Sequence, residues 1–254
     1  AGVGGVRLAP LAASVVSPGT LRHCVAATCG TDIPFLCRSL DHARRVLDGP
    51  IGQEILGEFD SAGLVALAWG EQGFRHITNN RNAIETPEDI AGMKLRTMEN
   101  PVHLAAFNAA GAAPTPMAWP EVISSLQQGT IDGQENPLSV IVSVKLDEVQ
   151  KYLTLSGHVY SPAMLLVSKP FWEGLSDEDK AAFEKGATEA VAAMRAFVDD
   201  VEQSGVETLK ERGMEVNELS EEQKADFRAS IESAYEGYYE TYGKELIDQI
   251  AATE

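Results

Sequence analysis

The stretch GMKLRTMENP, residues 92–101, decides the fold because it contains both a strand and the start of a helix. Its apolar residues alternate with Lys94 and Arg96, and this period of two is typical of a short β-strand. Asn100 followed by Pro101 is typical of a helix start. Arg96 is therefore expected at the junction between a strand and a helix.

The same arrangement occurs twice more along the chain. Trp119-Pro120 and Asn136-Pro137 also open helical patterns, with proline expected at the first helical position, where its missing N–H has no cost. Each of the three helices follows a strand candidate: MKLRT (93–97), AAPTPM (112–117) and GTIDGQ (129–134). Glycines are expected to end the first two helices, at Gly111 and Gly129. This alternation predicts βαβ units and a mostly parallel sheet.

Polar and aromatic side chains gather at the predicted carboxyl edge of this sheet, where open α/β folds bind ligands. The planar guanidinium of Arg96 can hold a carboxylate through two parallel hydrogen bonds. Arg75 likewise follows an apolar strand, LVALAW (64–69). The other members of the group are Trp69, Trp119 and Asn136. A lone arginine is more often paired with an acid of the protein itself, but five such residues favour a pocket for a small organic anion.

Composition excludes several classes of partner. The chain has 254 residues, a formal net charge of -18 and 44% hydrophobic residues. Nucleic acids and anionic membranes would repel such a chain, so neither is expected as a partner. No apolar run approaches the length of a membrane span, and no export signal is recognisable, so we expect a signal to be absent or already removed. Residues 176–254 contain 21 Asp and Glu against 8 Lys and Arg, which indicates solvated acidic helices.

Catalytic and metal-binding motifs are not found. The chain has no G-x-S-x-G, H-E-x-x-H or G-x-x-x-x-G-K-[ST] pattern, and its five histidines are scattered. We therefore expect no catalytic residue, no metal site and no cofactor. Three cysteines cannot all pair and match no zinc or redox spacing, so at most a packing role is expected for Cys24, Cys29 and Cys37.

The remaining segments show ordinary helix and strand patterns. Asp41 is expected to cap a helix that runs to Leu47, and a Gly-Pro pair separates it from a second helix. Residues 152–168 form either one long strand or two strands bent at Ser156-Gly157. A helix capped by Ser176, a small strand at 215–219 and a long helix from Ser220 to Tyr242 complete the chain.

Residues 94–137, KLRTMENPVHLAAFNAAGAAPTPMAWPEVISSLQQGTIDGQENP, resemble the central motif of the DctP-type solute-binding proteins of tripartite ATP-independent periplasmic (TRAP) transporters. The similarity extends from about Asp32 through the C-terminal helices. The resemblance implies an α/β periplasmic binding protein fold, type II-like, with two lobes, hinge strands and long connecting helices.

The resemblance also implies roles for individual residues. Arg96 would form the salt bridge to a solute carboxylate, and Trp119 would pack on the ligand. Asn136 would form a hydrogen bond near the carboxylate, and Arg75 would reach the ligand from the same side.

Three further positions are implied less directly. Glu99 and His158 would be specificity positions, and Ser17 would line the wall of the first lobe. The strand, helix and strand that open the first lobe in the family are expected to be absent here, so that this lobe is incomplete. Residues 1–74 and 157–185 would form the rest of the first lobe, 75–156 the second, and 186–254 the helices that span both.

The implied function is periplasmic capture of a carboxylate-bearing solute, such as a C4-dicarboxylate or a sugar acid, and its delivery to the membrane permease subunits of the transporter. The protein itself would not insert into the membrane. Two alternatives stay open: an enzyme that acts on a sugar acid or hydroxy acid in the same crevice, and an adaptor domain that uses its acidic helices.

Overall fold

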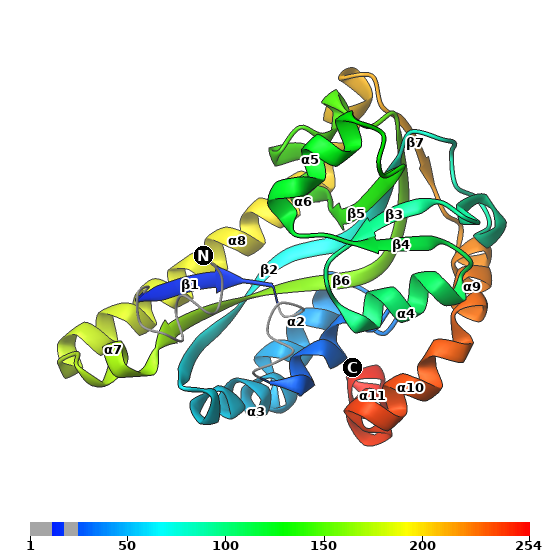
Figure 1. Ribbon diagram of the computed structural model, residues 1–254. Coiled ribbons are helices and arrows are strands. Elements are labelled where there is room, and N and C mark those ends of the chain that lie inside the picture. The colour runs from blue at the N-terminus through cyan, green and yellow to red at the C-terminus, as the bar shows by residue number, and fades with distance from the viewer. Residues whose placement is uncertain (1–11, 18–24) are drawn as a thin grey trace.

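One mixed β-sheet forms the frame of the molecule in the computed structural model, which describes residues 12–17 and 25–254 (Figure 1). The strand order is β1-β6-β2-β5-β3-β4, and β7 pairs with β6. The strands are β1 (Ala13–Val16), β2 (Leu64–Asn79), β3 (Lys94–Thr97), β4 (Ala113–Pro116), β5 (Gly133–Pro137), β6 (Tyr152–Ser168) and β7 (Glu215–Glu218).

Helices surround this sheet. The α-helices are α2 (Leu40–Asp48), α3 (Pro50–Glu58), α4 (Pro101–Ala109), α5 (Trp119–Gln127), α6 (Leu138–Ser143), α7 (Lys169–Glu173), α8 (Asp177–Glu211), α9 (Glu221–Ser230), α10 (Glu232–Tyr242) and α11 (Lys244–Ala252). The short 3₁₀ helices are η2 (Ala26–Asp32), η3 (Phe59–Ala62), η4 (Pro87–Ile90) and η5 (Leu146–Glu148). Figure 1 shows β1, α3 and α7 toward one end and β3, β4 and α5 toward the other.

The two long strands β2 and β6 connect these ends. They pair antiparallel from Leu64↔Ser168 to Asn79↔Tyr152, so the strand predicted at 64–69 continues for ten more residues. Of the two alternatives for residues 152–168, the single strand is correct. Its expected bend is a bulge at Gly157, which has a left-handed φ of 55° that glycine adopts without strain.

The prediction of a mostly parallel sheet is wrong for the sheet as a whole. β3 pairs parallel with β4 and β5, as the βαβ pattern of residues 94–137 predicts. However, β2 pairs antiparallel with β5, and β6 pairs antiparallel with both β1 and β2. β7 also pairs parallel with β6, so the sheet is mixed, and its two long strands, β2 and β6, run antiparallel to each other.

Two of the three predicted proline-initiated helices begin at or next to the proline. Pro101 is the first residue of α4, whose cap Asn100 accepts a hydrogen bond from Val102 N. Pro120 is the second residue of α5 instead of the first. Gly111 and Gly129 follow these helices with positive φ, as expected.

The prediction that a third helix begins at Asn136-Pro137 is wrong. Asn136 lies inside β5, Pro137 is the N-cap residue, and α6 begins only at Leu138. All five residues of β5 are buried, because this strand is hydrogen-bonded between β2 and β3. Ladder pairing on both sides therefore outweighs the local helix signal of Asn136-Pro137.

Smaller corrections concern the other helices. Ser39, not Asp41, caps α2, since its hydroxyl accepts from His42 N. The helix capped by Ser176 is confirmed as α8, which runs unbroken for 35 residues. The helix expected from Ser220 to Tyr242 is divided at Ile231 into α9 and α10.

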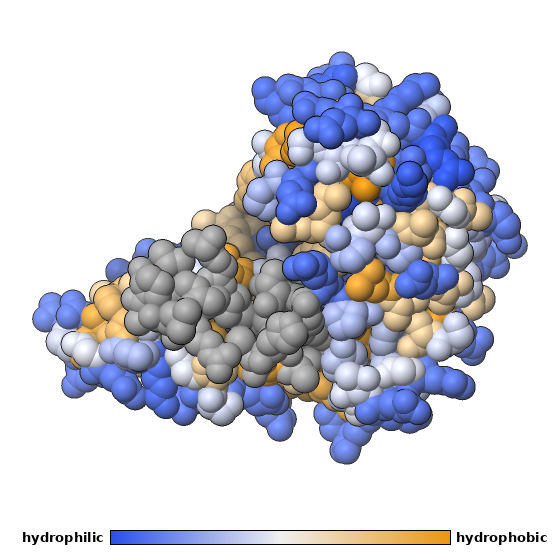
Figure 2. Space-filling view, in the orientation of Figure 1, coloured by the Kyte–Doolittle hydropathy of each residue, from blue (hydrophilic) through white to orange (hydrophobic). Residues whose placement is uncertain are grey.

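The C-terminal helices α10 and α11 contact α4, α2 and the segment before α2. Tyr238 donates its hydroxyl proton to Val102 O of α4 at 2.7 Å, and Tyr235 donates to Pro34 O. His42 Nε2 of α2 lies 2.9 Å from Ile250 O of α11. Hydrophilic residues cover most of the outer rim of the face in Figure 2, in keeping with the high net charge.

Of the three cysteines, Cys37 is a free thiol whose pKa is raised to about 12 by burial and by the nearby charge of Asp32. Cys24 and the side chain of Cys29 lie outside the part of the chain that the structure describes.

The close approach of α2 to α3 generates a stability prediction. A Cβ added at the buried Gly52 would lie 1.9 Å from Leu47 O, so Gly52→Ala is expected to destabilise the protein by about 1–3 kcal/mol. In the same helix, nothing lies within 4 Å of a Cβ at Gly57. Gly57→Ala is therefore expected to stabilise by about 0.5–1 kcal/mol. Urea unfolding of both variants tests the contrast, and equal effects would contradict this account of the α2–α3 packing.

Candidate functional site

Arg96 is a buried cation with no carboxylate partner in the described part of the chain. It is 3% exposed at the end of β3, where Nε and Nη2 donate to Met117 O at 3.0 and 2.6 Å. Its third nitrogen, Nη1, has no hydrogen-bond partner among the described residues. Burial lowers the pKa of Arg96 to about 10, so the group is still charged at neutral pH.

An aromatic ring covers this guanidinium. Trp119, the first residue of α5, has its ring centroid 5.5 Å from Arg96 Cζ, which is within the range of a cation–π contact. Trp119 is itself 37% exposed, unusually high for a large aromatic side chain. Arg96 and Trp119 thus form a cation with one flat apolar wall, as the strand-to-helix junctions predict.

Arg75 is the second buried arginine, and Glu135 neutralises it. Arg75 Nε lies 2.5 Å from Glu135 Oε2, and Nη2 lies 2.9 Å from Oε1, a bidentate pair between β2 and β5. Burial raises the pKa of Glu135, but the charges of Arg75 and His103 outweigh that effect and hold it well below its usual range. Arg75 lies in the middle of β2 and not, as expected, after a strand.

Further side chains complete the hydrogen bonds of Arg75. Nη1 donates to Ser161 Oγ and Nη2 to Asn136 Oδ1, each at 3.2 Å. Asn136 in turn donates to Gln134 Oε1. Ser17 joins the same network at one remove, because its hydroxyl donates to Gln72 Oε1 at 3.1 Å, and Ser161 donates to that oxygen at 3.3 Å.

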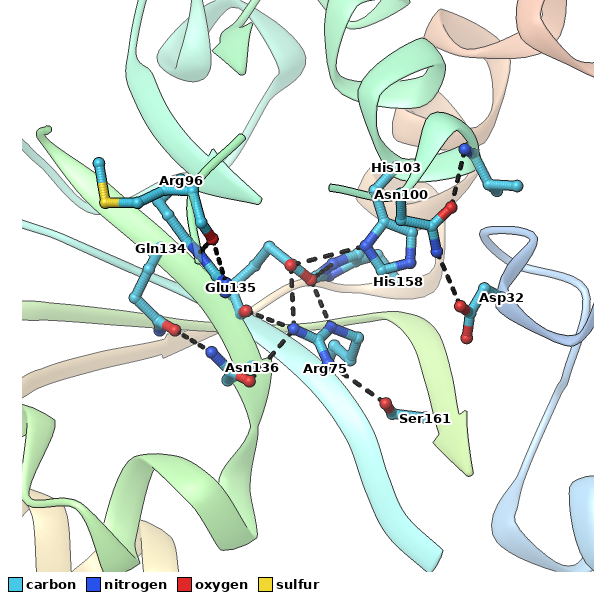
Figure 3. A network of polar contacts seen from close by, with 12 residues as sticks. Asp32, Arg75, Arg96, Asn100, His103, Gln134, Glu135, Asn136, His158 and Ser161 are labelled. Atoms are coloured by element: carbon cyan, nitrogen blue, oxygen red, sulfur yellow. Dashed lines mark hydrogen bonds and ion pairs between the residues drawn. The ribbon is translucent and has the colours of Figure 1, made fainter. Parts of the chain in front are cut away.

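Two histidines approach Glu135 from the other side. His158 Nε2 lies 3.2 Å from Oε2, and His103 Nδ1 lies 3.6 Å from Oε1. Burial lowers the pKa of His158, although its hydrogen bond to Glu135 opposes this. Figure 3 shows Glu135 between Arg96, Gln134 and Asn136 on one side and the histidines on the other.

The network ends at a buried carboxyl group that sequence reasoning did not single out. Asp32 Oδ2 accepts from Asn100 Nδ2 at 2.7 Å, while Asp32 Oδ1 has no partner among the described residues. Burial raises the pKa of Asp32 to about 6. The titratable members that we did not predict are Asp32, His103 and Glu135, and Gln72, Gln134 and Ser161 were not predicted either; only the positions of Gln134 and Glu135 next to Asn136 could have indicated some of them.

The structure brings most of the predicted residues together, with two placed differently. Trp69 is 2% exposed and donates from Nε1 to Gly52 O at 2.9 Å, so it lies in the core beside α3. Glu99 is exposed between β3 and α4, where its charge acts on Arg96. A ligand contact of either residue stays a prediction. Among residues 12–17 and 25–254, no group of three or more His, Cys, Asp or Glu side chains is placed to hold a metal ion.

The chain is similar to known proteins in both its sequence and its fold. Residues 3–241 match the profile of DctP, described as "Bacterial extracellular solute-binding protein, family 7". The chain belongs to the DctP family. This confirms the expected identity, and it assigns the protein to a family whose members bind solutes outside the cytoplasm.

Individual proteins similar to this chain are also described as solute-binding proteins. A solute-binding protein of Verminephrobacter eiseniae is 48% identical over 94% of this chain and 70% of its own length. A TRAP periplasmic solute-binding protein of Bordetella bronchispeptica, with density interpreted as pantoate, has a TM-score of 0.95 and 52% identity over 99% of this chain and 83% of its own. A TRAP protein of Polaromonas sp. JS666 bound to D-erythronate has a TM-score of 0.96 and 45% identity over 99% and 82%. These structures confirm the two-lobed α/β class of this DctP protein.

No helix in the described residues is both long enough and apolar enough to cross a membrane.

The buried ion pair generates the second prediction. Glu135→Gln removes the carboxylate that neutralises Arg75, and breaking a buried pair from one side costs about 3–5 kcal/mol. Glu148→Gln is the control, because Glu148 pairs with Lys145 at an exposed site where an ion pair contributes at most about 1 kcal/mol. Denaturant unfolding measures both, and a DctP protein that tolerates the two changes equally would contradict the structural role of Glu135.

Asp32 generates a pH prediction. Its pKa is 3.8 in the reference state and about 6 in the native protein, so between these values the native state holds a proton that the unfolded chain has released. The contribution of Asp32 to the free energy of unfolding therefore falls as pH rises through this window, by about 2 kcal/mol between about pH 4.5 and 7.5.

Asp32→Asn removes this dependence. The melting temperature of Asp32→Asn minus that of the unmodified protein should be more positive at about pH 7.5 than at about pH 4.5. Circular dichroism at the two pH values measures it. A difference that is constant with pH would show that Asp32 is ionised in both states.

Proposed function

We propose that this chain is the periplasmic solute-binding component of a TRAP transporter and that Arg96 binds the carboxylate of its solute. The observation that supports this most directly is a charged, buried guanidinium under an aromatic ring with no carboxylate partner among the described residues. A charge of this kind is costly to bury unless an anion binds there.

The charge balance favours a solute with one carboxylate. Of the two buried arginines, Arg75 is paired with Glu135 and Arg96 has no such partner, while Asp32, with a pKa of about 6, adds a negative charge to the same network at neutral pH. A dicarboxylate would bring a second negative charge without a matching cation among the described residues. Pantoate and D-erythronate, the ligands of the two similar structures, are both hydroxylated monocarboxylates. We propose a short hydroxy acid of this type as the solute.

Polar groups of the network around Arg75 suit the hydroxyl groups of such an acid. Gln134, Asn136, Ser161 and Ser17 offer amide and hydroxyl groups within one connected network. The resemblance to the family implies that Asn136 and Trp119 contact the ligand, and we propose those roles here. His158 and Arg75 would act mainly by holding Glu135 and the network in place.

Closure of two lobes has to supply the rest of the affinity. One charge-assisted pair contributes about 1.5–3 kcal/mol, whereas micromolar binding needs about 8 kcal/mol. We propose that β2 and β6 form the hinge between a lobe made of residues 1–74 and 157–185 and a lobe made of 75–156, with 186–254 spanning both. The closed protein would deliver its solute to the permease subunits. Membership of a solute-binding family supports binding without turnover over the enzymatic alternative.

Arg96→Ala tests the proposal. Loss of the bidentate cation should weaken binding of D-erythronate or pantoate about tenfold or more, and isothermal titration measures this directly. Lys94→Ala is the matched control, because Lys94 lies two residues earlier on the same strand with its side chain exposed. Circular dichroism confirms that each variant is folded.

Binding of succinate, a dicarboxylate, tests the proposed preference for a solute with one carboxylate. The unmodified protein should bind D-erythronate more tightly than succinate. Unchanged affinity in Arg96→Ala would refute the role of Arg96, while tighter binding of succinate would refute the preference for one carboxylate.

A further inference from the structure

A second cleft lies against β2, lined by Phe74 and His76. Neighbouring residues of a strand point to opposite faces of the sheet, so these two side chains face away from Arg75 and its network. The cleft has a volume of about 430 Å³. Its walls come from the segment before α2, from β6 at Gly157, and from α8 and α9.

His76 presents an unused hydrogen-bond donor to this cleft. Its side chain is 7% exposed, and Gly157 N donates to Nδ1 at 3.1 Å. The neutral ring therefore carries its proton on Nε2, for which no partner exists among the described residues. Burial lowers the pKa of His76 to about 3, and the nearby charges of His158 and Lys224 add to this effect. The ring is thus a neutral donor at physiological pH.

Phe35 forms part of the apolar wall in an uncommon backbone conformation. Its φ is 58°, which a bulky residue rarely adopts, and its N–H donates to His158 O at 2.8 Å. Such conformations concentrate at binding and catalytic sites, where the surrounding structure holds them. Together with Phe74, Phe35 gives the cleft an apolar floor next to the donor of His76.

Three of the five charged side chains that line the cleft are cations, namely Arg38, Lys224 and Arg228. Arg228 forms no ion pair with any described residue, and Arg38 donates from Nη2 only to the carbonyl oxygen of Thr253 at 2.7 Å. Lys224 is paired with Glu221 at 2.9 Å, and the remaining acid, Glu202, has its pKa raised by partial burial. Two of these cations, Lys224 and Arg228, come from the most acidic part of the chain, residues 176–254, which contains 8 Lys and Arg against 21 Asp and Glu.

We propose that this cleft is a second binding site, for an amphipathic organic monoanion such as an aryl or alkyl carboxylate. The apolar body of the ligand packs against Phe35 and Phe74, an acceptor atom of the ligand accepts a hydrogen bond from His76 Nε2–H, and Arg38 and Arg228 hold the negative charge. A small inorganic anion would leave the apolar floor unused, and a cation would meet two unpaired arginines.

The probe for the experiment is 4-fluorobenzoate, followed by ¹⁹F NMR on the full chain. Binding should be seen in the unmodified protein and be kept in Arg96→Ala, which separates this cleft from the proposed solute site. Arg228→Gln and Arg38→Gln should each weaken binding about tenfold, as expected for loss of one charged hydrogen bond. Ala225→Trp should abolish it, because Ala225 lines the cleft and the larger side chain fills it.

Arg81→Gln is the control, since Arg81 is an exposed arginine outside the cleft and should leave binding unchanged. D-Erythronate titration in Arg228→Gln and Ala225→Trp confirms that both variants keep a folded solute site. Undetectable binding to the unmodified protein, full binding in Ala225→Trp and both arginine variants, or loss of binding in Arg96→Ala would each overturn the proposal.

Discussion

The ion pair between Arg75 and Glu135 is the interaction on which the rest of the site depends. Both side chains are buried, and they join two strands of the sheet, β2 and β5, whose sequence positions are 60 residues apart. Since Glu135 neutralises Arg75, the remaining buried guanidinium, that of Arg96, carries the positive charge of the site. His158, Asn136 and Ser161 form further hydrogen bonds with the pair, so a charged network exists in a part of the protein where isolated charges would be unstable.

The features that could be predicted from the sequence are those set by interactions between residues close together in the chain. The junction of β3 and α4 was predictable because its signals are local: alternation, an Asn cap and Pro101 at the first helical position. Arg96 and Trp119 were found through such junctions. Asn136-Pro137 carries the same local signal, yet there the pairing of β5 with β2 and β3 prevails. The length of β2 was missed for a similar reason, because polar residues such as Arg75 and His76 are buried only through the distant strand β6.

The two sides of the long strands are physically connected. His158 contacts Glu135 through its ring and accepts from Phe35 N through its carbonyl, so one residue of β6 touches both the solute network and the wall of the second cleft. The bulge at Gly157 lies next to it and supplies the N–H that orients His76. If both sites bind their proposed ligands, thermodynamic linkage requires any effect of one on the other to be reciprocal.

The double hydrogen bond from Arg96 to the Met117 carbonyl has a stereochemical consequence. It occupies one edge of the guanidinium, and Trp119 covers one face, so an incoming carboxylate can approach in the guanidinium plane only from the edge that includes Nη1. The plane of the bound carboxylate would then be fixed relative to the protein. If Arg96 binds the solute carboxylate as proposed, further hydrogen bonds to the substituents of the adjacent carbon would distinguish the mirror-image forms of a chiral acid.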